Sequence, residues 1–272
     1  MKANERPSAQ RAAVFALLTF CGLACAQPSD ESSADLAKKL ANPISSLISV
    51  PFKYDWDKGS GPAGEVRSSF TIQPVIPFKL DGGWTVVSRT ILPVIRAESP
   101  VIGGDTNSGL GDITQSLFFS PSESTAGGWI WGAGPVFLLP TANNDRLGGG
   151  KLGLGPTAVL LKQSNGWTYG ALVNHLSSVA GSNSRPAFSA TYFQPFLSYT
   201  TKTYTTLGVN AESSYDWKRS QWTVPLNFSV SQLVKLSGQP VSFSLGLRSF
   251  AHKPEGGPHW GLRFTTTLLF PK

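Results

Sequence analysis

A histidine and a serine stand two residues apart in the segment Asn174-His175-Leu176-Ser177. Alternate residues of a β-strand point to the same face, so a strand at this position would hold the imidazole beside the hydroxyl. A histidine that accepts the proton of a serine hydroxyl makes that serine a nucleophile for cleaving esters. The mechanism also needs a third group that orients the imidazole, and Gln194 is a poor candidate for this role. The pair is either a nucleophilic site or a rim histidine with a polar neighbour.

Other patterns that could carry chemistry are incomplete. His252 and His259 flank one loop, but no third ligand accompanies them at metal-binding spacing. The run Gly148-Gly149-Gly150-Lys151 is followed by Leu152 and lacks the spacing of a phosphate-binding loop. The net charge is +7, yet the basic residues are scattered and form no nucleic-acid-binding motif. We therefore expect no metal, no cofactor and no nucleic-acid partner.

From Ile44 onward, apolar and polar residues alternate with a period of two, which predicts β-strands. Between residues 222 and 231, for example, every even-numbered residue is apolar. The predicted strands are Ile44–Tyr54, Val66–Lys79, Trp84–Arg96, Gly109–Ser120, Trp129–Thr141, Lys151–Lys162, Trp167–Ser178, Ala187–Thr200, Tyr204–Asp216, Trp222–Lys235, Pro240–His252 and His259–Phe270. Their spacing is wider than that of a soluble β-sandwich, and short connections alternate with long ones. The pattern predicts an all-β fold, a single up-and-down antiparallel transmembrane β-barrel of about 12 strands.

The tryptophans indicate where this barrel meets a membrane. All eight lie at the ends of predicted strands, beside turns, and indoles gather at membrane–water interfaces because the ring is apolar and its N–H needs a polar partner. Only 14% of residues are charged, against roughly 25% in soluble domains. The turns assign Trp84, Trp129, Trp131 and Trp167 to the periplasmic rim, and Trp56, Trp217, Trp222 and Trp260 to the outer rim. We therefore expect a lipid-embedded protein of the outer membrane of a Gram-negative bacterium.

The first 43 residues precede the barrel and divide into two parts. Residues 1–26 have a basic start, a short apolar run and the cleavage-like sequence Ala24-Cys25-Ala26, so we expect a cleaved signal peptide. A lipoprotein signal ending at Cys25 is the alternative. Residues 27–43 should hold a short amphipathic helix, Ser33–Ala41, that lies in the periplasm or enters the lumen as a plug. The barrel then occupies residues 44–272.

Polar residues on the inward face of the strands would line the lumen. The expected pore-lining charges are Lys53, Arg67, Arg89, Asp112, Glu212, Arg248 and Arg263. Closure of the barrel sets the last strand beside the first, so four of the basic residues come from neighbouring strands. These charges would either create a transverse field with a mild preference for anions, or form a salt-bridge network that plugs the barrel.

Prolines interrupt the predicted strands. Proline cannot donate to a sheet ladder, so each one is expected at a bulge, a rim or a break. The affected positions are Pro51, Pro74, Pro77, Pro93, Pro135, Pro140, Pro156, Pro195 and Pro225. The breaks would either adjust the curvature of the wall or, at Pro74/Pro77 and Pro135/Pro140, open it sideways to the membrane.

Several segments resemble a proteobacterial outer-membrane "transporter" family associated with the meta-cleavage pathway of phenol degradation. They are residues 40–52 (LANPISSLISVPF), 73–78 (QPVIPF), 109–112 (GLGD), 134–141 (GPVFLLPT) and 194–199 (QPFLSY). The resemblance implies a barrel that passes small solutes, including hydrophobic or aromatic compounds. The last strand is also similar to the C-terminal signal by which the outer-membrane assembly machinery binds barrels, although Pro271-Lys272 follow its final aromatic residue.

The expected function is a channel for the passive passage of small solutes, and not an enzyme. One alternative is an outer-membrane lipid hydrolase using His175 and Ser177. The His-x-Ser pattern resembles that of outer-membrane phospholipases, but Ser178-Val179 stands where those enzymes have Asn-Gly. The other alternative is a non-conducting structural barrel.

Overall fold

The computed structural model describes residues 31–61, 64–98 and 106–271. The predicted signal peptide, residues 1–26, and its lipoprotein alternative at Cys25 lie outside the described residues. The chain divides into two compact units, residues 1–31 and 32–272, and the elements below belong to the second unit apart from Glu31. None of the helical residues described forms a helix long and apolar enough to span a membrane.

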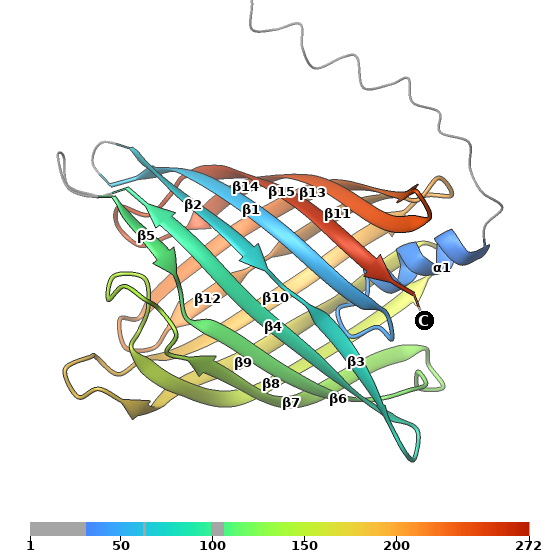
Figure 1. Cartoon of the computed structure of the whole chain (residues 1–272), viewed down its shortest axis with the longest axis horizontal. Helices are drawn as coiled ribbons and strands as arrows, with labels where there is room; N and C mark the ends of the chain where they lie inside the picture. Colours follow the sequence, from blue (N-terminus) through green and yellow to red (C-terminus); the bar gives the residue numbers. More distant parts are fainter. Residues whose placement is uncertain (1–30, 62–63, 99–105, 272) are drawn as a thin grey trace, which may run out of the picture. The chain divides into compact units, whose positions relative to one another are not determined.

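The described chain contains one helix, α1 (Glu31–Leu40), and fifteen strand segments. The strands are β1 (Ile48–Ser60), β2 (Glu65–Ile72), β3 (Val75–Leu80), β4 (Trp84–Ala97), β5 (Asn107–Leu110), β6 (Ile113–Pro121), β7 (Trp129–Leu139), β8 (Lys151–Ser164), β9 (Trp167–Gly181), β10 (Ser189–Thr200), β11 (Thr205–Ala211), β12 (Ser213–Asp216), β13 (Gln221–Leu236), β14 (Gln239–His252) and β15 (Trp260–Phe270). Because β2–β3, β5–β6 and β11–β12 each form one interrupted wall strand, the wall has 12 strands. β1 pairs antiparallel with β2 on one side and β15 on the other, so the sheet closes into the predicted barrel (Figure 1).

The wall strands match the predicted ones in number and order, but the first one is longer than expected. β1 continues to Ser60, whereas the sequence placed its end at Tyr54 and began a loop at Asp55. Three predicted strands are interrupted, at Gln73-Pro74, at Gly111-Asp112 and at Glu212. These differences matter for function because they determine where the carboxylates point.

The connections at one end of the barrel are mostly tight turns, and the longest connections lie at the other end, although the long connection expected from Asp55 is reduced to residues 61–64. At one end, β8 and β9 are joined by Asn165-Gly166, and both residues have positive φ (50° and 83°). This is the backbone of a tight hairpin turn that matches the twist of the two strands. Ser237-Gly238 joins β13 to β14 in the same way, with φ of 48° and 87°. The long connections, including residues 140–150 and 182–188, lie at the opposite end of the strands.

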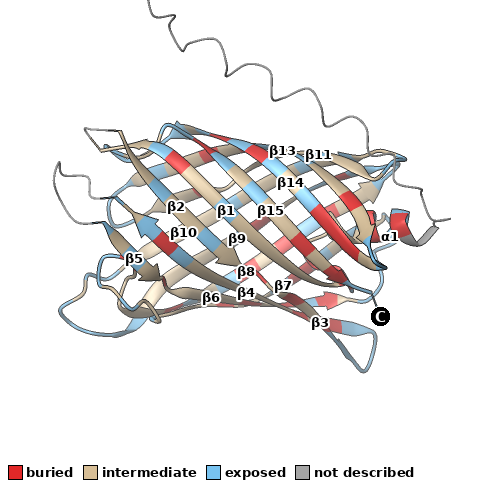
Figure 2. Ribbon diagram, turned by 45° about the horizontal axis from the view of Figure 1, so that its top comes forward, coloured by how far each residue is buried: buried red, intermediate tan, exposed pale blue. Residues whose placement is uncertain are grey.

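Two aromatic girdles surround an apolar outer face. At the short-turn end Trp84 contacts Trp131, and Trp167 contacts Tyr199. At the loop end Trp56 contacts Trp260 with ring centroids 5.4 Å apart. Tyr215 contacts both Trp217 and Trp222 at this end. The two tryptophan pairs each join residues that the sequence assigned to the same rim, and Tyr215 contacts two tryptophans of one predicted rim. Large apolar side chains are exposed between the girdles, for example Phe228, Leu245 and Phe264. Exposed positions recur along the strands of the wall (Figure 2). An apolar band between two aromatic girdles is the surface of a transmembrane barrel.

The interior at the short-turn end is filled by apolar side chains and α1. Leu36 and Ala37 of the helix are buried with Leu47, Leu233 and Leu269, so α1 packs inside the barrel mouth and does not extend freely beyond it. A second buried cluster occupies the opposite wall: Ile44, Val75, Val87, Phe118, Val159, Leu161 and Leu172. The helix begins two residues earlier than predicted, at Glu31. It narrows this mouth of the lumen.

The prolines lie at interruptions of the ladders, as the sequence predicted. Pro51 and Pro195 keep their register with β15 and β9, but on their other side they face the breaks at Gln73-Pro74 and at Glu212. Pro225 lies at a register shift between β13 and β14. A proline removes one donor, and the hydrogen bonds on either side of it hold the strands in register. At the break beside Pro74, the Gln73 N–H donates to the Pro51 carbonyl at 2.9 Å and the Thr90 N–H to the Pro74 carbonyl at 3.1 Å. The wall is therefore closed at Pro74, where a lateral opening was considered.

Candidate functional site

The guanidinium of Arg263 lies between two carboxylates in the lumen. Its Nε and Nη2 donate to Asp55 Oδ1 and Oδ2 at 2.6 and 2.9 Å, and its Nη1 and Nη2 donate to Glu212 Oε1 and Oε2 at 2.7 and 3.0 Å. Asp55 comes from β1, Arg263 from β15, and Glu212 from the break between β11 and β12. Arginine presents its N–H groups in a planar fork that matches carboxylates in this two-point geometry. The break directs Glu212 across the lumen to this fork.

Arg248 of β14 extends the same group of charges. Its Nη1 forms an ion pair with Asp55, and its Nε lies 3.2 Å from Asp57 Oδ1, close enough for an ion pair but without hydrogen-bond geometry. Both aspartates are inward because residues of β1 alternate, with Tyr54 outward. We call Asp55, Asp57, Glu212, Arg248 and Arg263 the charge cluster. Their side chains are only 8–17% exposed.

The remaining predicted cations stand outside these ion pairs. Lys53 Nζ donates to the neutral Gln73 side chain at 2.8 Å. Among the described residues Arg89 forms no ion pair, and its buried Nε has no hydrogen-bond partner. Arg67 faces the lumen beside Asp57, its register partner on β1. Arg248 and Arg263 complete the five cations that the sequence predicted along the pore, and these outnumber the three acids of the charge cluster.

Asp112 is placed differently from the other predicted pore-lining residues. It lies at the break between β5 and β6, and its carboxylate accepts hydrogen bonds from the backbone N–H groups of Ala142 (3.1 Å) and Gly149 (2.6 Å). These amides belong to the long connection between β7 and β8. The structure thus separates Asp112 from the charge cluster and gives it the task of fixing a loop at the outer rim.

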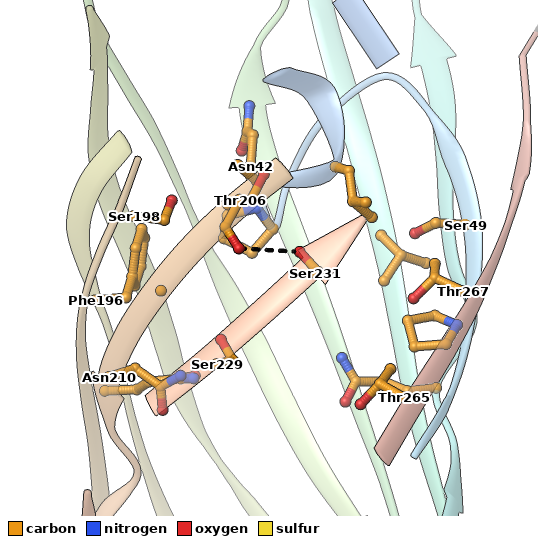
Figure 3. Close-up of a pocket in the computed structure, with 18 of the residues that line it drawn as sticks. Asn42, Ser49, Phe196, Ser198, Thr206, Asn210, Ser229, Ser231, Thr265 and Thr267 are labelled. Atoms are coloured by element: carbon orange, nitrogen blue, oxygen red, sulfur yellow. Dashed lines mark hydrogen bonds between the residues drawn. The ribbon is translucent and has the colours of Figure 1, made fainter. Parts of the chain in front are cut away.

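A chamber of about 330 Å³ occupies the lumen beside α1. We call it the lumen chamber. Residues 39–43 line one end, and Lys53 and Arg89 line the other, at the level of Thr265, the register partner of Lys53. Figure 3 shows Ser198, Thr206 and Ser231 on one side of this space and Thr265 and Thr267 on the other. An apolar patch of Val75, Leu172 and Phe196 completes its wall.

His175 and Ser177 form a hydrogen-bonded group on the outer face. His175 Nε2 lies 3.1 Å from Ser177 Oγ, and its Nδ1 lies 2.9 Å from Thr191 Oγ1 of β10. The Trp217 indole N–H donates to the same Thr191 oxygen at 2.8 Å. The group shares its strand face with the exposed Val173 and Val179, so it points away from the lumen. The side chain of the next strand that contacts the imidazole is Thr191, and not Gln194.

Comparison with solved structures identifies the architecture. The COG4313 outer-membrane channel from Pseudomonas putida F1 superposes with a TM-score of 0.63 at 14% identity, over 83% of this chain and 96% of that chain. The NanC porin superposes with a TM-score of 0.52 at 9% identity, over 83% of this chain and all of that one. The chain has the fold of outer-membrane barrels. Together with the girdles and the apolar band, this fold makes it a β-barrel protein of the Gram-negative outer membrane. Neither protein-family models nor curated protein sequences give a match.

Sequence reasoning missed two members of the charge cluster, Asp55 and Asp57. The predicted first strand ends at Tyr54, directly before both acids, so neither was placed on the inner face. The available signal was the period of two: Lys53, Asp55 and Asp57 continue one inward face, while Tyr54 and Trp56 continue the outward face. No described cluster of three or more His, Cys, Asp or Glu side chains could hold a metal ion.

Proposed function

We propose that the protein is a narrow channel for the passive passage of small solutes across the outer membrane. The observation that carries this proposal is the polar lumen chamber, which lies inside a closed wall whose outer face is apolar. Twelve strands fall between the side-chain-filled barrels of about eight strands and the open porins of about sixteen. The helix α1 and the charge cluster narrow the lumen further, so only small molecules would pass.

The excess of lumen cations supports a mild preference for anions. Two of the five cations, Arg248 and Arg263, are compensated by the acids of the charge cluster. We therefore expect the charge cluster to act as the salt-bridge network, while Lys53, Arg67 and Arg89 supply the field that attracts anions. The salt-bridge network and the anion-attracting field then belong to different parts of one lumen.

The solutes that we propose include small hydrophobic or aromatic compounds. The apolar patch of Val75, Leu172 and Phe196 in the lumen chamber supports this, as does the resemblance of segments such as residues 73–78 to the phenol meta-pathway transporters. The outward face of β15, which carries Leu262, Phe264 and Phe270, supports contact with lipids and binding to the assembly machinery.

Swelling of liposomes tests the channel directly. Proteoliposomes are diluted into isotonic solutions of neutral solutes of increasing size, and swelling reports entry. We expect swelling with the smallest solutes and a sharp loss as solute size increases. Swelling that is equal to that of protein-free liposomes for every solute would contradict the proposal.

A second candidate function is hydrolysis of lipid esters at Ser177. It is favoured by the 3.1 Å contact of His175 Nε2 with Ser177 Oγ and by the Thr191 hydroxyl behind the imidazole. The indole of Trp217, which donates to Thr191, supports a position of this group at a membrane interface, the depth at which lipid ester bonds lie. Ester cleavage that disappears in Ser177→Ala but persists in Ser189→Ala would establish it, since Ser189 is the neighbouring hydroxyl, 3.2 Å away. Absence of both swelling and ester cleavage would leave a structural barrel.

A further inference from the structure

Two cations that line the lumen chamber bind no carboxylate within the described part of the chain. The charge cluster satisfies Arg263 with Asp55 and Glu212, and it satisfies Arg248 with Asp55 and Asp57. Lys53 is bonded to a neutral amide, and Arg89 forms no ion pair among the residues described. A lysine and an arginine thus line the same confined space, and neither forms an ion pair with an acid among the described residues.

Arg89 is the more unusual of the two. Its Nε is buried and has no hydrogen-bond partner among the described residues. An N–H group that loses water without gaining a partner is costly, and the cost is larger for a charged group. A bound anion would remove this cost, because the guanidinium fork donates two parallel hydrogen bonds to a carboxylate.

The rest of the chamber restricts what else the anion can carry. Phe196, Leu172 and Val75 provide an apolar wall, and part of this wall belongs to the buried cluster of the lumen. The hydroxyls of Ser198, Ser229 and Thr265 line the remainder. A volume of about 330 Å³ accommodates a single-ring molecule but not an extended chain. The two cations also stand near Asp55 and Glu212, so a singly charged ligand fits better than a multiply charged one.

We propose that the lumen chamber is a binding site for a small monocarboxylate with a compact apolar body. Its carboxylate is bound by Arg89 and Lys53, and its apolar body packs on Phe196 and Leu172. The proposal deepens the proposed channel function, on which it rests, because it names the class of solute that the channel selects. Binding has to be weak for a solute that must also leave the site.

Calorimetric titration of the purified full chain in detergent micelles tests the site, with benzoate as the probe. Benzyl alcohol has the ring without the charge, and acetate has the charge without the ring. We expect saturable binding of benzoate. Benzyl alcohol and acetate should each bind with an affinity at least about tenfold lower, because each lacks one of the two contacts. Equal binding of benzoate and benzyl alcohol, or no saturable binding of benzoate, would overturn the proposal.

Two variants separate the contacts. Arg89→Gln should reduce benzoate affinity about tenfold or more and leave benzyl alcohol unchanged, because a charged hydrogen bond is lost. Phe196→Ala should weaken benzoate and leave acetate unchanged. Lys202→Gln is the matched control, since it removes one positive charge from an exposed short turn. Tryptophan fluorescence confirms that each variant is folded, and Arg89→Lys, which retains the charge, replaces Arg89→Gln if that variant fails to fold. Unchanged benzoate affinity in a folded Arg89 variant contradicts the proposal.

The swelling assay separates this inference from the channel function. Swelling without benzoate binding would overturn the binding site and leave the channel standing. Benzoate binding by a barrel that admits no solute would support the site and contradict passage.

Discussion

Arg263 connects two carboxylates that are far apart in the sequence, Asp55 on β1 and Glu212 at the β11–β12 break. The guanidinium of Arg263 makes four hydrogen bonds to these two acids. If the guanidinium is removed, both carboxylates lose their partner in a poorly solvated space. Breaking a buried ion pair by deleting one partner costs more than the pair contributes, since the remaining charge is left uncompensated.

We predict that Arg263→Met destabilises the barrel by about 3 kcal/mol or more. Urea unfolding in lipid or detergent, followed by tryptophan fluorescence, measures the change. Arg219→Met is the control: Arg219 pairs with Asp216 at 2.9 Å, but its side chain is 74% exposed, so its loss should cost about 1 kcal/mol or less. Equal effects of the two substitutions would show that the charge cluster does not brace the wall.

At this scale the sequence predicted the cations better than the acids. Lys53, Arg89, Arg248 and Arg263 stand on clearly alternating strands, so their inward direction followed from the pattern. The pairing of Arg263 with Glu212 could not be predicted, because Glu212 reaches it through a strand break that the period of two does not encode. Asp57 was missed for a different reason: the predicted first strand ends at Tyr54, whereas β1 continues to Ser60.

Among the elements, α1 has the most direct influence on passage. One side of the helix buries Leu36 and Ala37 against Leu47, Leu233 and Leu269, and the Gln163 side chain donates to the Lys38 carbonyl at 2.8 Å. Residues just after the helix line the lumen chamber. The helix therefore closes part of the short-turn mouth through a small apolar contact.

We predict that Leu36→Asp releases α1 and raises the single-channel conductance severalfold. A buried carboxylate without a partner is too costly to keep in this contact, so the helix leaves the mouth. Asp35→Asn is the control, because Asp35 is exposed and forms only a surface pair with Lys39. If conductance is the same in both variants, α1 does not narrow the lumen.

The contact between β6 and β7 depends on a glycine. The ladder between these strands skips Leu117 and Phe118, and a Cβ at position 134 would collide with the Leu117 carbonyl oxygen. Gly134 thus allows the two backbones to approach closely beside Pro135, where the sequence left open a lateral gap. The proline at position 135 predicted an irregular ladder at this place, but not that the two strands approach each other closely.

We predict that Gly134→Ala destabilises the barrel by about 1–3 kcal/mol, since strands must move apart to admit the methyl group. The midpoint of urea unfolding measures this. Gly127→Ala at the neighbouring turn is a suitable comparison, because a Cβ there makes only ordinary contacts. A folded Gly134→Ala variant as stable as Gly127→Ala would indicate a looser wall than the structure shows.

For the whole molecule, the tryptophan positions predicted the architecture with the fewest assumptions. Contacts such as Trp84–Trp131 and Trp56–Trp260 join partners within one rim, which confirms the division into two girdles. The number of strands and the closure of the barrel followed from the period of two in the sequence and from the even number of predicted strands. The interior could not be predicted in the same way, because the filling of a lumen depends on which side chains meet across it, and neighbours across a barrel leave no periodic signal.

Recording of single channels in planar lipid bilayers tests the central claim, that this barrel conducts, most directly. Purified full-length protein is added to one side, and current steps are recorded under a gradient of potassium chloride. The structure predicts small discrete steps with a reversal potential shifted toward anions, and Arg89→Gln should reduce that shift. Folded protein that gives no steps, or steps that favour cations, would contradict the proposed function.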